Sequence, residues 1–112
     1  MPISQLNLSL NEFMNLSENN PNTLYFMDFM ADWCGPCKMI KPYIHDLSEQ
    51  FENKDVQFYM VKSDDSEMEE LVEYFNITAL PTFVLFKNKN ILTTIVGVDK
   101  EKVRESIQRY LS

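Results

Sequence analysis

The length of 112 residues is enough to bury a hydrophobic core and predicts a single domain spanning residues 1–112. The 17 acidic and 10 basic residues give a formal net charge of −7, which argues against a nucleic-acid partner and against attraction to an anionic membrane. The N-terminal residues have the features of neither a secretory signal nor a mitochondrial presequence, and no apolar run approaches the roughly 18 residues of a membrane span. We therefore expect a cytoplasmic monomer, in a compartment that keeps thiols reduced.

The first half of the chain alternates between predicted strands and helices. Ser9 and Glu12 have the spacing of a capping box, which predicts the start of a helix, and a short strand is expected before it near Ile3. The nearly unbroken apolar run at 23–30 (TLYFMDFM) predicts a strand that is buried on both faces. An apolar stripe over residues 34–51 predicts a long amphipathic helix.

The second half adds a strand, a helix, a hairpin and a closing helix. Residues 55–61 read as a strand, and the acidic segment 64–75 keeps a helical spacing of apolar residues. The segments 81–86 and 91–98 predict a β-hairpin, and its turn contains asparagine, a residue that tolerates positive φ. Asp99 is the expected N-cap of the last helix. This order predicts an α/β fold with a central mixed sheet between helices.

The only two cysteines, Cys34 and Cys37, lie three positions apart. A tetrahedral zinc site needs four ligands, and His45 is the only histidine, so a structural zinc site is disfavoured. A structural disulfide would close a very short loop and remove little entropy from the unfolded chain. A redox pair has a mechanism: a helix that starts at Cys34 favours a thiolate there, and Cys37 follows one turn later. Pro36 suits the first helical turn, where its missing N–H costs nothing.

Asp28 is the only charged residue of the apolar segment 23–30. Burial disfavours a carboxylate, so its pKa should be raised. It lies six residues before Cys34, near enough for proton exchange with Cys37, although a buried aspartate held by backbone hydrogen bonds is the alternative. Pro81 cannot donate a hydrogen bond and should open a strand, with its peptide bond trans on the sequence alone.

Three stretches of the sequence together resemble the thioredoxin family. They are DFMADWCGPCKMIKP, which contains WCGPCK, then LPTFVLFKN, and VGV at 96–98. The resemblance implies the thioredoxin fold, a central mixed β-sheet flanked by helices on both faces. It also implies an enzyme that reduces protein disulfides through a mixed disulfide and takes electrons from an NADPH-dependent thioredoxin reductase. No cofactor or metal would be bound.

The resemblance assigns roles to particular residues. Cys34 would be the attacking thiol, Cys37 the resolving thiol that closes the Cys34–Cys37 redox disulfide, and Asp28 the buried proton carrier. Pro81 would be a cis proline opposite the cysteines that binds substrate by helping to hold its backbone in extended form. Disulfide-containing proteins would dock on a flat, mostly apolar surface, which comprises Trp33, Gly35, Pro36, Leu80 and Gly97.

The sequence also departs from the family pattern. Met30 stands where a second aromatic residue is common, Ala79 replaces a glycine, and a glycine of the hairpin turn is replaced near Lys89. The lysine that often accompanies the buried aspartate falls at Met60, or at Lys62 if the strand is shifted. The segment between residues 62 and 77 is about two residues long relative to the family. Two other functions remain open: a thioredoxin-fold binding or scaffold subunit, and a disulfide oxidase or isomerase.

Overall fold

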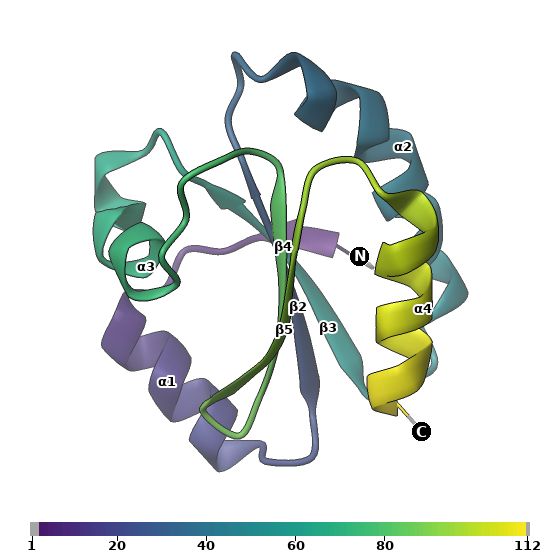
Figure 1. Ribbon diagram of the computed structural model, residues 1–112. Helices are drawn as coiled ribbons and strands as arrows, with labels where there is room; N and C mark the ends of the chain where they lie inside the picture. The colour runs from purple at the N-terminus through teal and green to yellow at the C-terminus, as the bar shows by residue number, and fades with distance from the viewer. Residues whose placement is uncertain (1–2, 112) are drawn as a thin grey trace.

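The computed structural model describes residues 3–111, which form one sheet and its flanking helices (Figure 1). The elements are β1 (Ile3–Gln5), α1 (Leu10–Asn19), β2 (Leu24–Met30), α2 (Gly35–Gln50), β3 (Val56–Lys62), the 3-10 turn η1 (Ser66–Met68), α3 (Glu69–Tyr74), β4 (Thr82–Lys87), β5 (Asn90–Val96) and α4 (Lys100–Leu111). Among these residues, no helix is long and apolar enough to cross a membrane.

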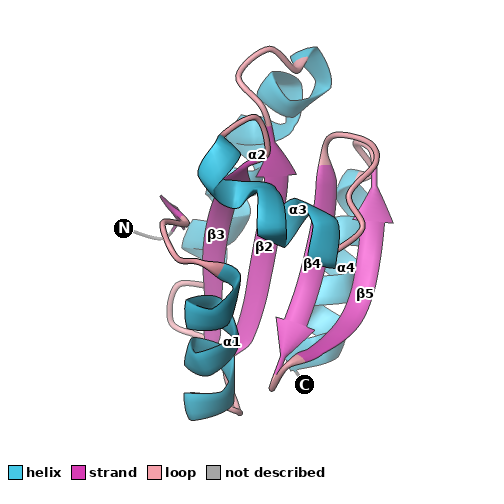
Figure 2. Cartoon of the chain, turned by 90° about the vertical axis from the view of Figure 1, so that its left-hand side faces the viewer, coloured by secondary structure: helices cyan, strands magenta, loops and turns pink. Residues whose placement is uncertain are grey.

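The five strands are ordered β1-β3-β2-β4-β5. β3 pairs in parallel with β1 and β2, whereas β4 pairs antiparallel with β2 and β5. Helices α1 and α3 cover one face of the sheet, and α2 and α4 cover the other (Figures 1 and 2). The predicted mixed sheet between two helical layers is confirmed.

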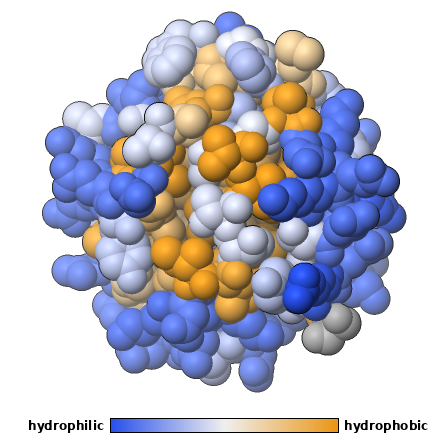
Figure 3. Space-filling model, in the orientation of Figure 1, coloured by the Kyte–Doolittle hydropathy of each residue, from blue (hydrophilic) through white to orange (hydrophobic). Residues whose placement is uncertain are grey.

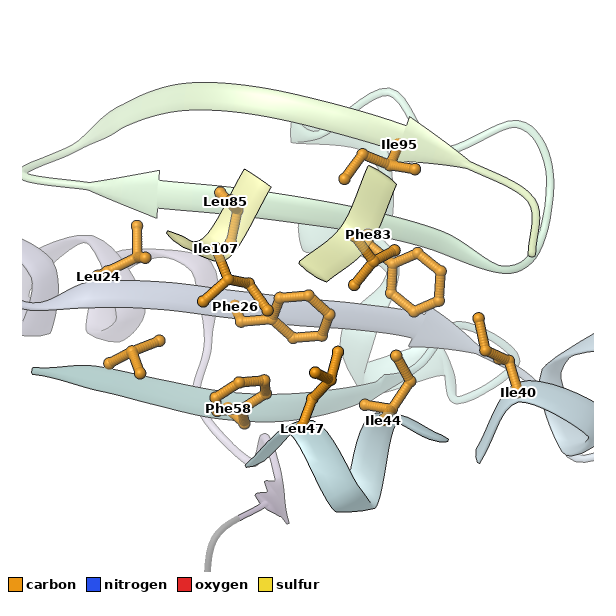
Figure 4. Close-up of a cluster of buried hydrophobic side chains, with 12 residues drawn as sticks. Leu24, Phe26, Ile40, Ile44, Leu47, Phe58, Phe83, Leu85, Ile95 and Ile107 are labelled. Atoms are coloured by element: carbon orange, nitrogen blue, oxygen red, sulfur yellow. The ribbon is translucent and has the colours of Figure 1, made fainter. Parts of the chain in front are cut away.

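The central strand β2 divides the hydrophobic core in two. All seven of its residues are buried, as the apolar run predicts. Because successive side chains of a strand point to opposite faces, Leu24 and Phe26 pack toward α2 and α4, while Tyr25, Met27 and Phe29 pack toward α1 and α3. Figure 4 shows the first of these cores, in which side chains of β2, β3 and β4 meet those of α2 and α4.

Two predicted helix caps are present. The Ser9 hydroxyl accepts a hydrogen bond from the Glu12 N–H (3.2 Å), and the Glu12 carboxylate accepts one from the Ser9 N–H (2.9 Å), so the capping box of α1 is complete. At α4, the Asp99 carboxylate accepts the N–H of Lys102 (3.1 Å). Both helices therefore begin where their capping residues predict.

The predicted helix over residues 64–75 is shorter than expected. The chain forms the 3-10 turn η1 first, and α3 contains only six residues. The Asp65 carboxylate accepts the N–H of Glu67 (3.0 Å) and so caps the 3-10 turn. Regular α-helix starts only after Met68, whose ψ of 5° is not helical. Local capping therefore prevails over the helical spacing of the apolar residues in this segment.

The hairpin between β4 and β5 turns at Asn88 and Lys89, which have φ of 47° and 66°. Asparagine was expected to adopt positive φ, but lysine seldom does. The contacts of Lys89 with α1 account for it: its N–H donates to the buried hydroxyl of Ser17 (2.9 Å), and its Nζ lies 3.5 Å from the Glu18 carboxylate.

β5 lies at one edge of the sheet and is the least covered of the longer strands. Ile91 and Val96 are among its exposed apolar side chains. On the face seen in Figure 3, apolar residues gather in the middle and hydrophilic residues surround them. On this face, the apolar surface is therefore concentrated rather than scattered.

Candidate active site

Cys34 is the N-cap of α2 and ends the short loop that connects β2 to this helix. Its backbone is extended (φ −84°, ψ 109°), and its Sγ accepts a hydrogen bond from the N–H of Cys37 (3.2 Å). Pro36, in the first turn, has no N–H to satisfy. The positive end of the helix dipole and this N–H both favour negative charge on the Cys34 sulfur, so the position suits a thiolate.

The two cysteines form a disulfide, with their Cα atoms 5.3 Å apart. Both are almost buried, with 4% of Cys34 and 5% of Cys37 exposed. They pack with Met30 and Ala31 at the end of β2. Among residues 3–111, no three His, Cys, Asp or Glu side chains lie close enough together to hold a metal ion.

Asp28 lies below this disulfide, inside the protein. It shares the side of β2 with Leu24 and Phe26, so its carboxylate points toward α2. Only 6% of Asp28 is exposed, and its Oδ1 is buried without a hydrogen-bond partner within the part of the chain that the structure describes. Loss of hydration raises the pKa of Asp28 to about 7, and the positive charge of Lys41 opposes this rise only in part. The alternative of a carboxylate satisfied by backbone hydrogen bonds does not hold for Oδ1.

Asp28 and Cys37 both line a cavity of about 90 Å³. A second cavity of about 110 Å³ lies beside the first, with Asp28, Lys41 and Met60 in both linings. Ser4 and His45 belong to the second lining. Asp28 and Cys37 therefore border the same small cavity.

The register of β2 and β3 settles which residue faces Asp28. Met60 pairs with Asp28 across the two strands, and Lys62 pairs with Met30. The Nζ of Lys62 forms an ion pair with the exposed carboxylate of Asp32 (2.9 Å). The lysine position noted in the family is therefore occupied by Met60.

The cation near Asp28 comes instead from α2, as Lys41. Sequence reasoning did not single out Lys41. The available signal was its spacing of four residues from Cys37, which places the two side chains on one face of the helix.

Part of the expected docking surface lies together beside Cys34. A groove of about 440 Å³ is lined by four of the expected residues, namely Trp33, Gly35, Pro36 and Leu80, and Trp33 is 72% exposed. Ala79, noted above in place of a family glycine, also lines the groove. Sequence reasoning did not identify the other lining residues, which are Ser63, Asp64, Val72, Ile77 and Thr78. For most of these, the only signal was the extra length of the segment between residues 62 and 77.

Pro81 and Gly97 are not part of that lining. They face each other instead, because the Gly97 N–H donates to the Pro81 carbonyl (2.9 Å). Gly97 has φ of 92°, a conformation that favours glycine. The Leu80–Pro81 peptide bond is cis, as the resemblance implied, so the trans bond expected from sequence alone is wrong.

A disulfide at the start of a helix, a buried aspartate beneath it and a cis proline at the neighbouring loop form one arrangement. The family model described as Thioredoxin matches residues 5–109. The chain belongs to the thioredoxin family. Thioredoxin of Ophiophagus hannah is 36% identical over 102 residues, which cover 91% of this chain and 93% of that protein.

Two further comparisons agree with this family. Thioredoxin H2 of Arabidopsis thaliana is 41% identical over 79% of this chain, but the match spans only 63% of the plant protein's own length. The crystal structure of the Malassezia sympodialis thioredoxin Mala s 13 superimposes with a TM-score of 0.86 at 33% identity, covering 98% of this chain and 91% of that one. The chain is thus a dithiol–disulfide oxidoreductase of the thioredoxin type, and a binding subunit with incidental thiols is not favoured.

Proposed function

We propose that the protein reduces disulfide bonds of other proteins through the Cys34–Cys37 pair. The observation that carries the proposal is Cys34 at the N-terminus of α2, bonded to Cys37 and adjoining an open groove. The groove gives a substrate disulfide access to a sulfur that is otherwise buried.

In the first step, the Cys34 thiolate attacks one sulfur of the substrate disulfide. A mixed disulfide forms and the first substrate thiolate leaves. The Cys37 thiol then loses its proton toward Asp28 and attacks the Cys34 sulfur. The second substrate thiolate leaves, and the Cys34–Cys37 disulfide remains. Two electrons pass to the substrate, and its two thiolates take up two protons.

The residues around the pair have distinct proposed roles. Asp28 accepts the proton of Cys37, which its pKa of about 7 and the shared cavity support. Trp33 and Leu80 contact the substrate beside Cys34, with Gly35 and Pro36 at the same rim. Pro81 holds a substrate backbone in extended form opposite the cysteines, and Gly97, whose N–H donates to the Pro81 carbonyl, belongs to the same docking surface.

The cellular setting is also part of the proposal. An NADPH-dependent thioredoxin reductase would return the disulfide to the dithiol, and the protein itself would need no cofactor. We expect it to act as a single-domain cytoplasmic monomer. Its negative charge supports protein substrates over nucleic acids or anionic membranes.

Two measurements test the proposed function. Equilibration with glutathione, followed by the fluorescence of Trp33, gives the reduction potential of the pair. We expect a value more negative than about −250 mV, low enough to donate electrons to protein disulfides in a cytosol. A value near about −180 mV would instead indicate an oxidase or isomerase.

Substitution tests which cysteine attacks the substrate and which one resolves the mixed disulfide. Cys37→Ser should accumulate a mixed disulfide with substrate, because the resolving thiol is missing, whereas Cys34→Ser should abolish turnover. Mass spectrometry of the trapped adduct identifies the bonded cysteine. Turnover by Cys37→Ser at the normal rate would overturn the two-thiol mechanism.

A further inference from the structure

The groove beside Cys34 has one apolar side and one polar end. Val72, Ile77 and Leu80 face the motif residues Trp33 and Pro36 across it, in a volume of about 440 Å³. The polar end is formed where β3 stops and the chain turns toward η1, at Ser63 and Asp64. A side chain that enters this groove therefore meets both apolar side chains and a carboxylate.

The position of Ser63 is fixed by the sheet. Its N–H donates to the Met30 carbonyl (2.8 Å), so it is held beside the end of β2. Its Oγ is buried and has no hydrogen-bond partner within residues 3–111. Because this oxygen has almost no accessible surface, the exposed Asp64 carboxylate is the polar group that a ligand in the groove can reach.

The charge at this end of the groove is negative. Asp64 is exposed and makes no hydrogen bond or ion pair with any described residue, whereas the neighbouring Asp65 carboxylate caps η1. The nearby cation, Lys62, is already paired with Asp32 (2.9 Å). The chain contains no Lys, Arg or His between Ser63 and Phe86, and α3 adds further glutamates. Lys62 also interacts electrostatically with Asp64 and Asp65, so this one cation lies among three carboxylates and the local charge remains negative.

We propose that this groove selects disulfide-containing polypeptides that carry a lysine or arginine beside the reactive cysteine. The aliphatic stem of the basic residue lies along Val72 and Ile77, and its cationic head reaches the Asp64 carboxylate. Long basic side chains combine these two kinds of contact. The inference rests on the proposed reduction of protein disulfides and adds a substrate class to it.

The experiment uses the fully reduced protein and three synthetic peptides. Each peptide has one cysteine, is disulfide-linked to a second copy of itself, and carries Lys, Gln or Glu next to the cysteine. A second set places the variable residue on the other side. Stopped-flow fluorescence of Trp33, the only tryptophan, reports the second-order rate constant. Salt at 0.15 M limits charge interactions to about 8 Å.

We expect the lysine peptide of one set to react about fivefold faster than its glutamine counterpart, which is the effect expected for one charge pair beside apolar side chains. The glutamate peptide should react slowest. Asp64→Asn should remove most of this preference. Glu73→Gln is the matched control, since it also removes one negative charge but lies on α3 outside the groove lining. It should leave the preference unchanged.

Two outcomes would overturn the inference. Equal rate constants for the three peptides in both sets would show that the groove does not select substrates by the charge of the residue beside the cysteine. An equal loss of preference in Asp64→Asn and Glu73→Gln would show general electrostatic steering in place of a site. If the reduced protein reacted with none of the peptides, the proposed function itself would fail, which is a separate result.

Discussion

Two aspartates near the end of β2 differ in burial, and this difference gives the same side chain two different properties. Asp28 and Asp32 are four residues apart and carry the same side chain. Asp28 is inside the protein, with one oxygen unpartnered, and its pKa rises to about 7 because burial removes its hydration. Asp32 is exposed and pairs with Lys62 at 2.9 Å. One carboxyl can therefore exchange a proton near neutral pH, and the other forms an ion pair at the surface.

The difference follows from the strand. Within β2, side-chain direction alternates, and the sheet and α2 close over Asp28. Asp32 comes after the strand has ended, where the chain turns outward toward the motif. A buried acid that is left unpaired destabilises the fold when ionised, and such groups concentrate at sites of proton transfer.

The largest expected effect comes from Asp28→Asn. The pKa of Asp28 is raised from 3.8 to about 7, so the folded state binds more protons than the unfolded state between these values. Its contribution to stability is therefore lost as pH rises through this window, by up to about 4 kcal/mol at pH 8. Asp28→Asn should remove that loss. Urea unfolding of both proteins at pH 4 and pH 8 measures it.

The same variant should slow resolution of the mixed disulfide, because Cys37 loses its proton acceptor. We expect at least a tenfold decrease at pH 7, since a general base contributes roughly 100-fold or more. Asp32→Asn is the control with the same substitution. An unchanged pH profile of the resolution step in Asp28→Asn would contradict the proton-carrier role, whatever its stability.

The sequence predicted Asp28 better than it predicted the surroundings of Asp28. The apolar run around it required burial on both faces, and the motif six residues later located the cysteines. Its neighbours depend on contacts between distant elements. Only the register of β2 and β3 places Met60 opposite Asp28, and only the docking of α2 brings Lys41 near.

The same limit applies elsewhere in the chain. The positive φ of Lys89 depends on its hydrogen bond to Ser17, 72 residues away, which no local pattern contains. The cis bond before Pro81 could be expected from the resemblance but not from the local residues. Elements with strong periodicity or capping were predictable, and positions decided by tertiary contacts were not.

An intermediate effect is expected when a cation is placed opposite Asp28. Met60 is partly buried and pairs with Asp28 across the strands, so Met60→Lys would bring an ammonium group toward the carboxylate. The pKa of Asp28 should fall by about 1–2 units. Carbon-13 NMR titration of the Asp28 carboxyl measures the change, with Met60→Leu as the uncharged control. An unchanged pKa would show that the new lysine extends to solvent instead.

The smallest effect is expected for Asp32→Asn, which removes the exposed ion pair. The hydrogen bond and charge of Asp32 raise the pKa of Lys62 above 10.5, so their contribution to stability is complete at neutral pH and is lost only at higher pH. Exposed pairs of this kind contribute little and are screened by salt. The urea midpoint of Asp32→Asn should therefore be slightly below that of the wild type at low salt and pH 7, and equal to it in 1 M NaCl. A large decrease of the urea midpoint that persists in high salt would mean that Asp32 supports the structure of the motif. Asp28 and Asp32 would then differ in burial, but both would be needed for the site.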